Sequence, residues 1–131
     1  MIPPTCGLVL TPQRLVAVVL RPGGEARRLV RAALTDDARY GLVEYLSATD
    51  AEIVVTDALA RGDPVARRAA RAGLVVWVAP DALVAAITRA AGVTAPARVA
   101  TVLARLPATP LARAQLRRLP TAAEPRQVPL L

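Results

Sequence analysis

The amino-acid sequence predicts one α/β domain built on a mixed five-stranded sheet with flanking helices. Three apolar, β-prone runs separated by turn residues fill the first part of the chain, which is typical of an antiparallel meander. Helical periodicity then alternates with short, continuously apolar strands, which is typical of parallel pairing with helical crossovers. The length of 131 residues suits a single hydrophobic core.

The expected meander comprises strands at residues 7–10, 15–20 and 26–34. Residues 11–14 carry a proline at their second position, where a turn favours it. Residues 21–24 read Arg-Pro-Gly-Gly, which is a second strong turn signal. Because both turns are short, we expect consecutive strands to pair antiparallel.

Helix-capping residues divide the remainder of the chain. Thr35 can cap the first helix, which ends before residue 51, and Asp63 followed by proline starts the second. Gly73 and Gly92 are suited to ending helices, and Thr94 is expected to cap the last one. The later helices are expected at residues 64–72, 81–91 and 96–106, and the two parallel strands at 52–56 and 74–79.

The chain is expected to fall into three segments. Residues 1–106 form the folded domain, and residues 107–119 form a short basic amphipathic helix. Residues 120–131 hold three prolines and no periodicity. We expect this last segment to be an extended tail that orders only against a partner or a neighbouring chain.

The charge balance is strongly basic. All 17 positively charged residues are arginine, against ten acids, which gives a net charge of +7. Such a field favours nucleic acid, an acidic partner or an anionic membrane. Aromatic residues make up only 2% of the chain, so few side chains can stack on bases.

The sequence also bears on compartment. The N-terminus shows no basic region before an apolar stretch, so we expect no signal peptide. Apolar runs such as residues 74–80 are far too short to cross a bilayer. The lone Cys6 excludes an internal disulfide and fits a reducing compartment. We therefore expect a cytoplasmic protein that does not insert into a membrane.

Side chains for the common catalytic chemistries are scarce. Histidine is absent, which removes the imidazole base and any Cys–His pair. Ser47 is the sole serine and has no nucleophile elbow around it. Cys6 without histidine cannot form a typical zinc site.

Short motifs in the predicted strands and in the last helix follow one another in a characteristic order. The first reads Gly-Leu-Val-Leu-Thr and precedes a strand, another reads Ile-Val-Val-Thr-Asp, and a third runs from Ala-Gly-Leu through Trp to Pro. In this order they resemble the RNase H-like superfamily, and within it the RuvC resolvase branch and the related DEDD transposases. The resemblance extends over residues 7–106. The motifs lie at residues 7–11, 14–18, 53–57, 72–80 and 97–105.

The departures from this superfamily concern its metal ligands. The resemblance implies two Mg²⁺ ions held by three or four carboxylates. Val9 stands where the first aspartate is expected, and the last helix offers Arg98, Ala100 and Thr101 in place of acids. Only Asp57 remains in register, and one carboxylate cannot hold a metal pair. We therefore expect a degenerate, catalytically inactive member with no catalytic residue, metal or cofactor.

Three groups of arginines are the candidate nucleic-acid-binding residues. The first lies on and before the second helix, the second on a strand expected at the sheet edge, and the third along the C-terminal helix. Each group can contact phosphates, but each is also compatible with a solvated face or a charged edge that prevents strand addition. The groups are Arg61, Arg67, Arg68 and Arg71; Arg27, Arg28 and Arg31; and Arg113, Arg117 and Arg118.

Two functions stay open at this point. The first is a pseudo-nuclease that binds duplex or branched DNA, or another nucleic acid, through its arginines. The second is a protein-interaction or dimeric adaptor module on the same degenerate fold, with the C-terminal tail as its contact. Salt separates them, because phosphate binding weakens steeply as salt rises and an apolar interface does not.

Overall fold

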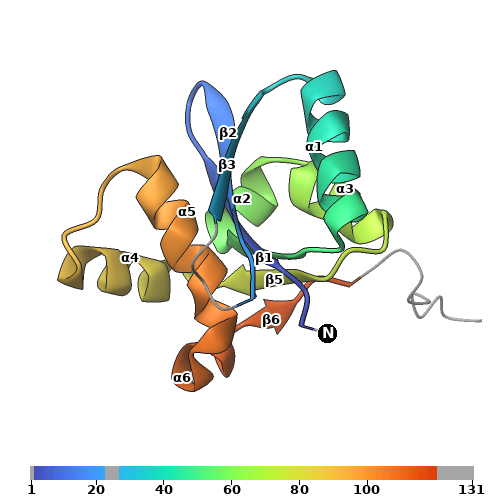
Figure 1. Cartoon of the computed structure of the whole chain (residues 1–131). Coiled ribbons are helices and arrows are strands. Elements are labelled where there is room, and N and C mark those ends of the chain that lie inside the picture. Colours follow the sequence, from blue (N-terminus) through green and yellow to red (C-terminus); the bar gives the residue numbers. More distant parts are fainter. Residues whose placement is uncertain (1, 23–26, 121–131) are drawn as a thin grey trace, which may run out of the picture.

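The computed structural model describes residues 2–22 and 27–120 (Figure 1). A mixed sheet has the strand order β3-β2-β1-β4-β5-β6. β1, β2 and β3 form an antiparallel meander, β4 pairs parallel with both β1 and β5, and β6 pairs antiparallel with β5. The strands are β1 Thr5–Leu10, β2 Arg14–Leu20, β3 Arg27–Ala33, β4 Glu52–Thr56, β5 Val76–Ala79 and β6 Arg117–Arg118.

Helices pack on both faces of the sheet. Figure 1 shows α1 and α3 on one side and α4 and α5 on the other. The α/β class, the meander and the flanking helices are as predicted. The helices are α1 Asp36–Thr49, α2 Asp57–Gly62, α3 Val65–Arg71, α4 Asp81–Ala90, α5 Pro96–Arg105, the 3₁₀ turn η1 Leu106–Ala108 and α6 Pro110–Arg113.

The prediction of five strands is wrong, because the sheet has six. Arg117 and Arg118 form β6, and the next residue donates its backbone N–H to the carbonyl of Val76 at 2.8 Å. β6 satisfies backbone groups at the outer edge of β5, which would otherwise be open. A strand of two residues is too short to show side-chain alternation, so it could not be predicted from the sequence.

The predicted C-terminal helix is also wrong in extent. α6 ends at Arg113, and a turn leads from it into β6. Arg113, Arg117 and Arg118 therefore do not share one helical face. The predicted tail falls, apart from Pro120, outside the described residues.

The capping predictions hold at most helix ends. Thr35 accepts a hydrogen bond from the Ala38 N–H at 3.2 Å, as predicted. Asp63 accepts one from the Val65 N–H at 2.9 Å, but the N-cap residue of α3 is Pro64, one position later than predicted. Gly73 and Gly92 follow the ends of α3 and α4, as predicted, with positive φ of +90° and +66°. The prediction for Thr94 is wrong, because Ala95 caps α5 and no side chain bonds to its first turn.

One glycine positions α5 on the sheet. A Cβ at Gly7 of β1 would lie 1.7 Å from the carbonyl oxygen of Ala100 on α5. The missing side chain lets the helix backbone rest directly on the strand. The Thr5 hydroxyl donates to the Ala104 carbonyl at 2.7 Å and fixes the same contact one helical turn further along.

Aliphatic side chains form the core on both faces of the sheet, as the lack of phenylalanine requires. On the α1 and α3 side, Leu15, Leu46 and Ile53 are almost fully buried. On the α4 and α5 side, Val54 and Leu103 are fully buried. Within the described residues, no helix is long and apolar enough to cross a membrane.

Candidate functional site

The resemblance assigns its metal-binding acids to the ends of β1 and β4 and to α5. β1 and β4 are parallel neighbours, with Gly7 opposite Val54, and α5 packs on β1. A cavity of about 160 Å³ lies here. Its lining is aliphatic except for the Thr56 side chain. The lining residues are Leu8, Val9, Leu10, Thr56, Ala58, Leu59 and Val99.

Asp57, the one acid in register, is occupied by other contacts. It lies in the first turn of α2, and its carboxylate accepts a 2.7 Å hydrogen bond from Arg117 Nη2 on β6. Thr56 caps the same helix by accepting from the Leu59 N–H at 3.2 Å. The N-terminal end of the α2 dipole and the guanidinium of Arg117 therefore stabilise the negative charge of this half-buried carboxylate.

The other acids near α2 also serve helix ends. Asp81 accepts from the Ala58 N–H at 3.1 Å and pairs with Arg61 at 3.6 Å. On α5, Thr101 is buried and donates to its own helix at the Ala97 carbonyl. Across the residues that the structure describes, no three His, Cys, Asp or Glu side chains gather as metal ligands. The donor set does not fit a pair of Mg²⁺ ions.

The first arginine group does not act as one cluster. Arg61 lies on α2 and pairs with Asp81, and Arg68 on α3 pairs with Asp36 at 2.9 Å. Arg67 and Arg71 are exposed on α3 and have no acidic partner among the described residues. These two therefore keep their charge available to a ligand.

The second group is divided by the pleat of β3. β3 is an outer strand of the sheet, as predicted. Arg28 lies over the ring of Tyr45 on α1 at 5.8 Å, whereas Arg31 stands opposite Val16 and points to the other face. Arg27 belongs to β3 by its backbone, and its side chain lies outside what the structure describes.

The third group divides as well. Arg113 lies over the Trp77 ring at 5.6 Å and donates to the Pro107 carbonyl at 3.4 Å. Arg117 pairs with Asp57, and Arg118 is exposed on β6. Arg113 thus ties the C-terminal segment to β5, and Arg117 ties it to α2.

A groove between α1 and α3 was not predicted. Its volume is about 650 Å³, and it opens beside Arg68 and Arg71. On α1 the lining residues recur three or four positions apart, so they share one face of the helix. This spacing is visible in the sequence, but the sequence does not indicate which element packs beside that face. The lining residues are Tyr40, Val43, Glu44, Ser47, Ala48, Arg68, Arg71 and Ala72.

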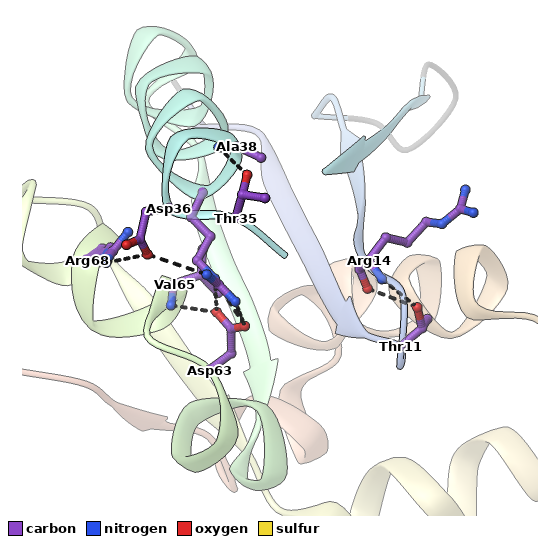
Figure 2. A network of polar contacts seen from close by, with 9 residues as sticks. Thr11, Arg14, Thr35, Asp36, Ala38, Asp63, Val65 and Arg68 are labelled. Atoms are coloured by element: carbon purple, nitrogen blue, oxygen red, sulfur yellow. Dashed lines mark hydrogen bonds and ion pairs between the residues drawn. The ribbon is translucent and has the colours of Figure 1, made fainter. Parts of the chain in front are cut away.

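An ion-pair network holds the two walls of this groove together (Figure 2). The buried Asp63 accepts three hydrogen bonds of 3.0–3.2 Å from Arg39 of α1, while it accepts the Val65 N–H at the start of α3. Asp36 contacts both Arg39 and Arg68. The hydrogen bond with Asp63 raises the pKa of the Arg39 guanidinium above its ordinary value. The network fixes α1 against α3.

Cys6 contributes no reactive group. It is fully buried in β1, and burial raises the pKa of its thiol to about 12. At neutral pH it therefore stays a protonated, inaccessible thiol.

Comparisons with known proteins add no relative. A scan against protein-family models and a search of curated proteins both find no match to this chain.

Proposed function

We propose that this chain is a catalytically inactive RNase H/RuvC-like domain that binds nucleic acid in the cytoplasm through exposed arginines. The meander followed by two parallel strands supports the resemblance stated from the sequence. The aliphatic cavity at Val9 and the Arg117 contact at Asp57 support the absence of metal-dependent cleavage.

One observation carries the binding proposal: the excess positive charge is exposed and not compensated. Several arginines have no acidic partner within the described residues, and they lie on both helical layers and on the sheet. Guanidinium groups of this kind bind phosphate oxygens in a bidentate manner. The exposed, unpaired arginines include Arg14, Arg31, Arg67, Arg71, Arg89, Arg98, Arg105 and Arg118.

Few aromatic side chains are available to stack on bases, which indicates that the protein recognises the sugar-phosphate backbone of the nucleic acid. Tyr45 and Trp77 are half-buried against the core, and Arg28 and Arg113 lie over their rings, so neither ring is free to stack on a base. Phosphate contacts position a protein on nucleic acid without reading sequence. We therefore expect little sequence preference on duplex DNA.

Fluorescence anisotropy with labelled duplex, four-way-junction and single-stranded DNA tests the proposal. Binding should weaken as salt rises, and Arg67→Ala/Arg71→Ala should weaken it further. Arg89→Ala on α4 removes only one of these exposed charges and should therefore weaken binding less than the double variant. Tighter binding to the junction would support the resolvase branch. No binding of any form at low salt would contradict the proposal.

A protein-interaction module is the second candidate, and an exposed apolar side chain favours it. Leu111 on α6 is 83% exposed, and the outer edge of β3 has no strand partner in the described part of the chain. Light scattering that gives a dimer mass, reduced to the monomer by Leu111→Ser, would support this function. A wild-type monomer would count against it.

A further inference from the structure

The groove between α1 and α3 combines features that a nucleic-acid binder needs for an unpaired nucleotide. The volume of about 650 Å³ falls within the range of small-molecule sites. Hydrocarbon from Val43, Ala48 and Ala72 forms part of its lining. The network of Arg39, Asp63, Asp36 and Arg68 holds the walls at a fixed separation.

Tyr40 supplies the stacking surface. The chain has two tyrosines and one tryptophan, and cation–π contacts cover Tyr45 and Trp77. Tyr40 lines the groove and is 66% exposed, although most large apolar and aromatic side chains here are buried or half-buried. An exposed aromatic ring beside cationic side chains is the usual platform for a base in single-stranded recognition.

The charges of the groove match a nucleotide. Arg68 and Arg71 lie along the α3 wall, where their guanidinium groups can contact a phosphate. Asp36 uses one donor atom of Arg68 and leaves others available. Glu44 and Ser47 lie on the α1 wall, and a carboxylate accepts hydrogen bonds from an exocyclic amino group such as N4 of cytosine.

We propose that the α1–α3 groove binds one unpaired nucleotide of a nucleic acid, with its base on Tyr40, its phosphate on Arg68 and Arg71, and an amino group of the base at Glu44. This inference rests on the proposed function and adds a site and a base preference to it. It predicts that single strands rich in cytosine bind more tightly than thymine homopolymers, because thymine offers no amino group.

The test measures the affinity of fluorescein-labelled oligo-dC, oligo-dT and duplex DNA by anisotropy at neutral pH. Tyr40→Ala should weaken oligo-dC binding by about five-fold to a hundred-fold, which is the effect of removing one base-stacking contact. Tyr40→Phe keeps the ring and should stay within about two-fold of wild type. Duplex affinity should be nearly unchanged in both variants.

Variants at Glu44 and Arg71 test base selection and phosphate binding separately from stacking on Tyr40. Glu44→Ala should remove the preference for oligo-dC over oligo-dT, whereas a purely electrostatic effect would raise both affinities equally. Arg71→Ala should weaken oligo-dC binding more than Arg105→Ala, which removes a matched exposed charge on α5. Unchanged oligo-dC binding by Tyr40→Ala, with duplex binding intact in the wild type, would overturn the groove proposal alone. Failure of the wild type to bind any DNA would overturn both proposals.

Discussion

At the scale of single residues, Asp63 connects α1 to the start of α3. Its side chain is 3% exposed and accepts hydrogen bonds from Arg39 and from the Val65 N–H. A carboxylate with so little solvent needs such partners to stay charged. The residue therefore joins α1 to α3 and supports the groove between them.

Replacement of Asp63 should destabilise the fold. Asp63→Ala leaves Arg39, which is 14% exposed, without its main partner, and should cost about 3 kcal/mol of unfolding free energy. Loss of the hydrogen bond that Asp63 accepts from the Val65 N–H adds about 1 kcal/mol. Urea denaturation followed by circular dichroism measures both. An effect below about 1 kcal/mol would contradict this role for the pair.

The sequence identified many of these residues without their partners. Asp63 was expected at the start of a helix, and it accepts the Val65 N–H there, but its pairing with Arg39 spans 24 positions. Arg68 was expected to face a ligand, and its contact with Asp36, 32 positions away, was not expected. Tyr40 was not singled out as a site residue. Local spacing indicates which residues share a helix face, and only the packing of α1 on α3 determines what that face meets.

At the scale of elements, the contact of α5 with β1 depends on Gly7. Gly7→Ala would place a methyl group 1.7 Å from the Ala100 carbonyl oxygen, so the helix must move away. We expect a loss of at least about 3 kcal/mol in thermal or urea unfolding. Gly41→Ala on α1 is the control, because its Cβ meets nothing within 4 Å. That variant should gain about 0.5–1 kcal/mol from helix propensity. Equal effects of the two variants would contradict the close approach.

Two threonines that look alike in sequence should differ in effect. Thr35 caps α1, so Thr35→Ala should cost about 1 kcal/mol. Thr94 bonds to no backbone group of the first turn of α5, so Thr94→Ala should be close to neutral. Unfolding midpoints of the two variants check this directly. A comparable loss in both would mean that Thr94 caps α5 after all.

Most helices and the first five strands were predictable because each has a local signal. Turn residues separate the strands of the meander, and α1, α3 and α4 have capping residues or glycines at their ends. α2 was missed, since its six residues fall between a strand and Asp63 with no periodicity of their own. The segment from Leu111 to Leu119 has helical spacing of its arginines, but pairing with β5 and the contact with Asp57 determine its structure.

At the scale of the whole molecule, the net charge of +7 acts as a single field around a small domain. Ion pairs compensate part of it near α1, α2 and α3, and the exposed arginines retain the rest. A polyanion would release counterions on binding, whereas an apolar partner would not. Salt dependence therefore reports on the whole charge distribution in one experiment.

Binding of nucleic acid through exposed arginines can be measured as the slope of log Kd for duplex DNA against log salt concentration. We expect a linear, steep dependence, in which each phosphate contacted contributes about one unit to the slope. Arg67→Ala/Arg71→Ala should reduce the slope by about two. A slope near zero, or a slope that the double variant leaves unchanged, would contradict binding through these arginines.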